Sequence, residues 1–273
     1  MRPAASVFTH MSTPLNKTLL GLVIALSVCC SVANAQTTSA DIPRHLAFAR
    51  QLVENTKPED NRYILGGQFI SFPGDPQSDK YAVGADCSGF LLAILARARY
   101  PTQSRMEYLP GSARKRSRPA AQDFVYSIEM ERGFERIREA TAIKPGDLLA
   151  HAMLNVEDQR QTGTTGHVFL IDSYPKAIAP KNPVVAGTRQ FEVSVIDSND
   201  EHVGADDTRL ADSSNKITGL GRGTIRLYVG PDGEVVGWAR TFKDVKRFFS
   251  YDPRFPSDTK PRKAAIGRPS MGG

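Results

Sequence analysis

The sequence predicts an α+β fold in which an apolar helix packs on an antiparallel β-sheet. Apolar residues recur at spacings of three and four over residues 41–56, which is typical of a helix with one buried face. An apolar run of helix formers follows Cys87 and predicts a second helix there. The later part of the chain is a series of short apolar or alternating segments, at residues 144–149, 166–171, 191–198, 224–229 and 235–239. Helices followed by a run of strands are typical of the α+β class.

The N-terminus has the features of a secretory signal peptide over residues 1–35. An apolar run at residues 19–28 follows a lysine and ends in Ala33-Asn34-Ala35, a small-x-small cleavage pattern. The run is too short for a lasting membrane span. We therefore expect cleavage near Ala35 and a periplasmic or secreted mature protein, with Met1 and Met11 both open as the start of the chain.

Cys87 is the only cysteine of the expected mature chain, because Cys29 and Cys30 lie in the leader. A lone cysteine is most often a small buried apolar residue. An exported protein in an oxidising compartment, however, seldom keeps a free thiol. Its place at a predicted helix start, between Asp86 and Ser88, exposes the thiol to backbone N–H groups and to the positive end of the helix dipole, which favour a thiolate. We interpret Cys87 as a catalytic nucleophile.

A cysteine nucleophile needs a nearby imidazole base, and the imidazole needs an orienting partner. His167 opens a strongly apolar strand pattern and is the predicted base; His151 is the runner-up, with a hydrogen-bonded core histidine as its favoured interpretation. We expect His45 on the surface of the first helix and His202 in a polar loop. Asp197 ends the strand pattern at residues 193–197 and is the predicted partner of His167; Asn199 is the alternative.

Four motifs follow one another in a fixed order. They are Tyr63-x-x-Gly66-Gly67, Asp86-Cys87-Ser88-Gly89-Phe90, Pro145-Gly146-Asp147-Leu148 and Gly166-His167, followed by the strand at residues 191–198. In these motifs the chain resembles the NlpC/P60 family, papain-like cysteine peptidases that cut peptidoglycan peptides. The match covers roughly residues 41–240.

The resemblance implies a papain-like fold, with Cys87 and His167 as the catalytic pair and no cofactor. It also places the Tyr63 hydroxyl near the substrate, with Asp86 and Ser88 at the oxyanion end of the helix; the alternative for Tyr63 is an aromatic that anchors its loop to the core. Asp197 is a departure, because the family more often has His, Asn or Gln at the third position. Gly66 and Gly67 predict a backbone that passes close to another strand or to a ligand.

We expect one catalytic domain at residues 36–250, with two long insertions at about 100–140 and 198–221 and a flexible tail at 251–273. The first insertion contains a predicted helix at 119–131. The tail is rich in Pro, Lys, Arg and Gly, a composition typical of mobile segments.

Other classes of function lack their signatures. The net charge of +6 is modest, and the basic cluster at residues 114–118 has no interleaved aromatics, so we interpret it as a solvated loop and not as a nucleic-acid site. The segment at residues 197–208 fails the calcium-loop pattern, and the mature chain has no zinc, nucleotide or serine-hydrolase motif. We expect no metal and a monomer.

These interpretations together predict an exported cysteine peptidase that hydrolyses amide bonds in peptidoglycan stem peptides through a thioester. Two alternatives stay open. One is a papain-like amidase or acyltransferase that acts on another envelope or host substrate, and the other is a non-catalytic envelope binding protein.

Overall fold

The computed structural model describes residues 42–110, 118–210, 217–257 and 259–271. The predicted leader, both possible start residues and most of the basic cluster at 114–118 lie outside the described residues. The described residues all belong to the compact unit Thr37–Gly273.

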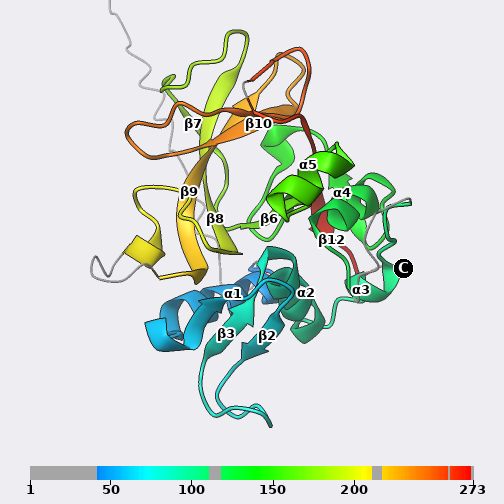
Figure 1. The fold of residues 1–273 in the computed structure, drawn as a ribbon, viewed down its shortest axis with the longest axis vertical. Coiled ribbons are helices and arrows are strands. Elements are labelled where there is room, and N and C mark those ends of the chain that lie inside the picture. The colour runs from blue at the N-terminus through cyan, green and yellow to red at the C-terminus, as the bar shows by residue number, and fades with distance from the viewer. Residues whose placement is uncertain (1–41, 111–117, 211–216, 258, 272–273) are drawn as a thin grey trace, which may run out of the picture. The chain divides into compact units, whose positions relative to one another are not determined.

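The elements form a mixed α+β arrangement, which confirms the predicted class (Figure 1). The helices are α1 (Arg44–Asn55), α2 (Cys87–Arg97), α3 (Thr102–Arg105), α4 (Ala121–Glu129) and α5 (Val156–Thr162), with 3-10 turns η2 (Pro58–Asp60), η3 (Ala140–Ala142) and η4 (Thr208–Leu210). The strands are β1 (Asn61–Tyr63), β2 (Gln68–Ser71), β3 (Ala82–Ala85), β4 (Phe134–Ile137), β5 (Leu148–Met153), β6 (Gly166–Ile171), β7 (Lys176–Ile178), β8 (Arg189–Asn199), β9 (Gly219–Val229), β10 (Val235–Arg240), β11 (Phe249–Ser250) and β12 (Arg262–Pro269).

Two sheets carry these strands. The small sheet has the order β1-β3-β2, with β1 parallel and β2 antiparallel to β3. The large sheet has the order β11-β10-β9-β8-β6-β5-β12-β4, with β7 paired to β8, and its strand pairs are antiparallel. The predicted hairpin at residues 224–239 is present as β9 and β10, in longer form.

The large sheet is buried on both faces where it meets the helices. Alternate residues of a strand point to opposite faces. Val168 and Leu170 therefore join the core formed with α1, α2 and α4, whereas Phe169 and Ile171 join a second cluster with Trp238. This double burial explains why the strand patterns are nearly continuous apolar runs.

The helix α2 begins and ends where its sequence allows. Asp86 caps its first turn by accepting a hydrogen bond from the Gly89 backbone N–H at 2.8 Å. Apolar side chains fill the body of the helix, and Arg99 then leaves the helical conformation with a φ of 66°. In Figure 1, α2 lies below the ends of β6 and β8, against which it packs.

The prediction of a flexible tail at residues 251–273 is wrong for residues 262–269. These residues form β12, which pairs with β5 on one side and β4 on the other. The composition is basic and rich in small residues, but Ala265 and Ile266 are buried in the sheet. Gly267 leaves room for Ile128 of α4, since a Cβ there would lie 2.7 Å from its side chain. The strand supplies hydrogen-bond partners that the facing edges of β4 and β5 would otherwise lack.

The two predicted insertions contribute to this unit. The helix predicted at residues 119–131 is α4, whose Phe124 and Ile128 are fully buried, and β4 follows it in the large sheet. The described part of the second segment includes the end of β8, η4 and the start of β9. Among the described residues, no helix has the length and apolar character needed to cross a bilayer.

Candidate active site

Cys87 is the first residue of α2 and is 7% exposed. The Asp86 carboxylate beside it accepts hydrogen bonds from neighbouring side chains and from the backbone. Its Oδ1 accepts from the Ser88 hydroxyl at 3.0 Å, and its Oδ2 accepts from the Gly66 backbone N–H at 2.8 Å and from Arg118 at 2.5 Å. The side chains of Asp86 and Ser88 thus hold the helix start to its surroundings, while both residues line a cavity of about 440 Å³ with Cys87.

Arg118 is the described member of the basic cluster, and it differs from the solvated residue that we expected. Its side chain is 12% exposed and bonds both Asp86 and the Ser88 hydroxyl, the latter at 2.8 Å. Arg118 therefore belongs to the lining of the site.

The glycines of the first two motifs pack directly against each other. A Cβ on Gly89 would lie 1.9 Å from the carbonyl oxygen of Gly67, and a Cβ on Gly67 would lie 2.5 Å from that of Gly84 in β3. Gly66 has a φ of 82°, in the region that favours glycine. The expected close approach is confirmed, and its partners are β3 and the start of α2.

His167 and Asp197 meet at the ends of β6 and β8. His167 Nε2–H donates to Asp197 Oδ2 at 2.8 Å. His167 lines one cavity with Cys87, and because Nε2 faces Asp197, Nδ1 is the ring nitrogen left for the thiol. Burial lowers the pKa of His167, but the neighbouring Cys87 and the Asp197 carboxylate outweigh burial and raise it above its ordinary value. The arrangement favours the imidazolium form of His167.

Two further contacts fix the relative positions of these residues. Ser198 Oγ donates to the Ala85 carbonyl oxygen at 2.7 Å, which ties the end of β8 to the strand that leads into Cys87. Asn199 Nδ2 donates to Asp197 Oδ2 at 3.2 Å. Asp197 is thus the residue that contacts His167, and Asn199, the alternative, contacts Asp197.

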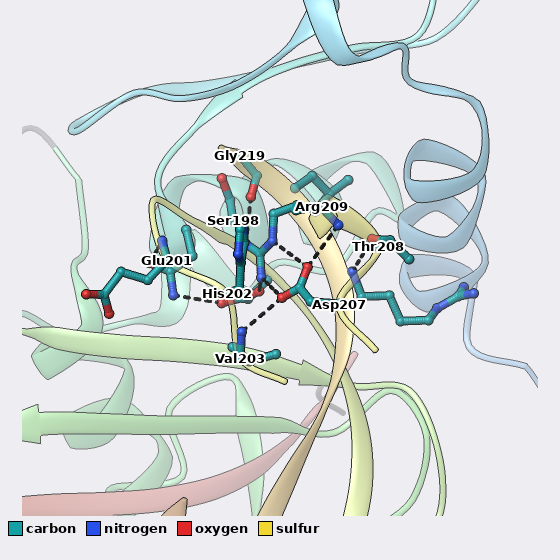
Figure 2. Close-up of polar contacts among 12 residues, drawn as sticks. Ser198, Glu201, His202, Val203, Asp207, Thr208, Arg209 and Gly219 are labelled. Atoms are coloured by element: carbon teal, nitrogen blue, oxygen red, sulfur yellow. Dashed lines mark hydrogen bonds and ion pairs between the residues drawn. The ribbon is translucent and has the colours of Figure 1, made fainter. Parts of the chain in front are cut away.

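Arg209 is a site residue that the sequence did not indicate. It is 2% exposed and donates to Asp197 Oδ1 at 2.9 Å. It also donates to both oxygens of Asp207 and to the Gly219 carbonyl oxygen at 2.9 Å (Figure 2). Burial raises the pKa of Asp197, but the Arg209 guanidinium and His167 outweigh burial and lower it. Arg209 lies in a polar loop segment without periodicity, so only its burial reveals its role.

Tyr63 ends β1 and lines both cavities that open at Cys87. Burial raises the pKa of its hydroxyl, and the neighbouring Cys87 and Asp86 raise it further. The hydroxyl therefore keeps its proton at neutral pH and can donate a hydrogen bond to an oxygen atom in the site.

The other three described histidines lie outside the group formed by Cys87, His167 and Asp197. His45 is buried, not on the surface as we expected, because its Nε2–H donates to the Gly146 carbonyl oxygen at 2.7 Å. His151 is buried and its ring centroid lies 6.2 Å from that of His167. His202 contacts the Ile217 carbonyl oxygen at 3.3 Å. Within the described ranges, no group of three or more His, Cys, Asp or Glu residues is arranged to hold a metal ion.

Comparison with known proteins gives a viral relative. The chain is 33% identical over 215 residues to "Uncharacterized protein R653" of Acanthamoeba polyphaga mimivirus, an alignment that covers 76% of this chain and 91% of the viral protein. No protein-family model matches the chain. No solved structure matches it either.

Proposed function

We propose that this chain, which belongs to the same family as the mimivirus protein R653, is a cysteine hydrolase that cleaves amide bonds through a thioester acyl-enzyme. One observation carries the proposal. Cys87, at a helix start, lines one cavity with His167, which in turn donates to the buried carboxylate of Asp197. A nucleophile, a base and an orienting group in this arrangement are what acyl transfer by a thiol requires.

The proposed reaction has two steps. The Cys87 thiolate attacks the amide carbonyl carbon, and a C–S bond forms as the oxygen takes up negative charge. The Tyr63 hydroxyl and the backbone N–H groups at the start of α2 stabilise that oxyanion. The His167 imidazolium then protonates the amine nitrogen as the C–N bond breaks. In the second step neutral His167 takes a proton from water, which attacks the thioester and releases the acid and Cys87.

The proposed substrate is a peptidoglycan stem peptide. The NlpC/P60 motif order supports this choice, and the same resemblance supports a papain-like version of the α+β fold. The leader pattern at residues 1–35 supports export to the compartment where that polymer lies.

Digestion of purified sacculi tests the function and the substrate together. Sacculi are incubated with the wild type, with Cys87→Ala and with His167→Ala, and the soluble products are identified by mass spectrometry. We expect cleaved stem peptides from the wild type alone. His202→Ala is the matched control and is expected to retain activity, because the His202 ring hydrogen-bonds the Ile217 carbonyl oxygen and lies outside the group formed by Cys87, His167 and Asp197.

A second measurement separates the alternatives. The wild type is treated with an iodoacetamide probe at neutral pH. Strong labelling of Cys87 without release of stem peptides contradicts the peptidoglycan substrate and favours an amidase or acyltransferase on another substrate. A Cys87 no more reactive than glutathione contradicts catalysis and favours a binding protein.

A further inference from the structure

A cavity of about 820 Å³ is lined by Cys87 and His167 and extends to Arg262, His151 and Trp238. The proposed chemistry uses none of the last three residues. They come from β12, β5 and β10, so the large sheet brings three distant parts of the sequence to one wall of the cavity.

Arg262 is a half-buried cation that lacks a counter-ion among the described residues. Its guanidinium lies 4.5 Å from the ring centroid of Phe249, and its Nη1 donates to His151 Nδ1 at 3.4 Å. Burial lowers the pKa of Arg262. The nearby Tyr251 raises this pKa and the nearby Arg240 lowers it, so the net shift is downward. Arg240 is itself paired with Glu201. A cation removed from water without an anion is costly, so this site favours an anionic ligand.

The tautomer of His151 adds to this preference. Because Nδ1 accepts from Arg262, the proton of the neutral ring is on Nε2. Burial and the nearby Arg262 and His167 lower the pKa of His151, which keeps the ring neutral at pH 7. His151 and Trp238 are 2% and 4% exposed, and within the described part of the chain neither His151 Nε2 nor Trp238 Nε1 has a hydrogen-bond partner.

Apart from the Tyr251 hydroxyl, which can donate or accept, the unpartnered buried groups beside this wall are donors. Arg262 Nε, His151 Nε2–H and Trp238 Nε1–H are all donors without an acceptor among the described residues. The His151 and Trp238 ring centroids lie 5.8 Å apart. A carboxylate offers two acceptor oxygens and a negative charge, and it forms charge-assisted hydrogen bonds with a guanidinium.

We propose that Arg262, with His151 and Trp238, forms a subsite for a carboxylate of the substrate beside the Cys87–His167 pair. The inference rests on the proposed function and specifies its substrate class: a peptide with an acidic group near the cleaved amide. The His151 and His167 ring centroids are 6.2 Å apart. Since an extended peptide advances about 3.3 Å per residue, the carboxylate belongs to a residue within about two positions of the cleaved bond.

Alkylation of Cys87 by paired reagents tests the subsite without knowledge of the natural substrate. The reagents are N-bromoacetyl derivatives of glycine, β-alanine, 4-aminobutyrate and 6-aminohexanoate, each as the free acid and as the neutral carboxamide. Rates are measured on the full chain at the Cys87 peptide by mass spectrometry. For at least one linker length we expect the acid to react about tenfold faster than its carboxamide, the scale of one charge-assisted hydrogen bond.

Variants assign the preference to Arg262. In Arg262→Ala the ratio of acid to carboxamide rates falls to that of glutathione, while the carboxamide rate and the melting temperature stay near those of the wild type. Arg262→Lys keeps part of the ratio. The matched control is Lys263→Ala, the next residue of β12, whose side chain pairs with Glu129 on the opposite face at 2.7 Å and whose loss leaves the ratio unchanged.

Two results overturn the subsite: equal rates for acid and carboxamide at every linker length, or an acid preference that survives in Arg262→Ala. A different result would contradict the proposed function: Cys87 would react with the carboxamides no faster than glutathione does. The ratio of the acid rate to the carboxamide rate would still report on the subsite.

Discussion

Asp197 divides its two carboxylate oxygens among three partners. Oδ2 accepts from His167 and Asn199, Oδ1 accepts from Arg209, and the side chain is shielded from solvent. A buried carboxylate stays charged only with such partners. Arg209 therefore positions Asp197 and keeps it ionised, and Asp197 in turn orients the His167 ring.

Asp197→Asn tests the link between the carboxylate and the base. The pKa of His167 is raised in part by Asp197, so His167 holds its proton to higher pH than a free imidazole does. Removal of the carboxylate charge lowers that pKa, and the proton is lost at lower pH. We expect the alkaline limb of the pH profile of Cys87 alkylation to move to lower pH.

The control for this change is Asp206→Asn, because Asp206 bonds Thr224 and has no contact with His167. Its alkaline limb is expected to match that of the wild type. An unchanged limb in Asp197→Asn contradicts the role given to Asp197.

Arg209→Met tests the buried ion network. The substitution leaves Asp197 and Asp207 buried without their shared cation, and loss of one partner of a buried pair costs about 3–5 kcal/mol. We expect a loss of that size in the free energy of unfolding measured in urea. Arg254→Met removes an exposed arginine paired with Asp232 and is expected to change stability little. Equal stability of the two variants would refute this account of Arg209.

At the scale of elements, hydrogen bonds and close packing hold the loop after β1 against the start of α2. The Gly67 carbonyl oxygen accepts from the Asp86 backbone N–H at 3.2 Å, and the Gly66 N–H donates to the Asp86 carboxylate. Gly89 allows the two backbones to come this close. The first two sequence motifs are thus the two sides of one contact, which holds the start of α2 and Cys87 against the loop after β1.

Gly89→Ala tests that contact. Alanine normally stabilises a helix relative to glycine, but here its Cβ would lie 1.9 Å from the Gly67 carbonyl oxygen. We expect a loss of about 1–3 kcal/mol in unfolding free energy, as for overpacked cores, together with slower alkylation of Cys87. Ala96→Ser, at an exposed position of the same helix, is the control. A Gly89→Ala variant as stable and reactive as the control is incompatible with the packing described.

Elements with a regular pattern could be predicted from the sequence, and those without one could not. The three- and four-residue spacing in α1, and the apolar runs of β6 and β8, locate the helix and the strands that carry His167 and Asp197. In contrast, β12 is basic and short of large apolar residues, and its partners in β5 are more than 100 residues away in the sequence. Its place in the sheet depends on non-local pairing that local composition does not encode.

The same contrast holds within the site. Cys87, His167 and Asp197 stand at the boundaries of regular elements, where the sequence pattern marks them. Arg209 lies in the short turn η4, and an arginine in a polar segment is normally exposed. Its burial follows from two aspartates, Asp197 and Asp207, one of which belongs to a different element.

At the scale of the whole molecule, β12 joins β4 to the rest of the large sheet. It also brings Arg268, whose guanidinium binds the buried Asp147 carboxylate at 2.9 and 3.0 Å next to the Pro145–Gly146 turn. The last described strand thereby supports the turn that leads into β5.

Removal of residues 262–273 tests this role. The deletion exposes the edges of β4 and β5 and leaves Asp147 buried without Arg268. We expect the shortened chain to lose its cooperative thermal transition in circular dichroism. Removal of residues 271–273 alone, which leaves β12 intact, is expected to keep the transition. A cooperative transition in the longer deletion would show that β12 is dispensable for folding.

The rate of Cys87 alkylation by iodoacetamide at pH 7 tests the central claim, that His167 activates Cys87, most directly. A free thiol is only a few per cent thiolate at this pH, so an imidazolium–thiolate pair predicts a Cys87 that reacts about tenfold or more faster than glutathione. His167→Ala is predicted to reduce the rate to that of glutathione, and His202→Ala to leave it unchanged. A wild-type rate equal to that of glutathione, or a rate unaffected by His167→Ala, would contradict the claim.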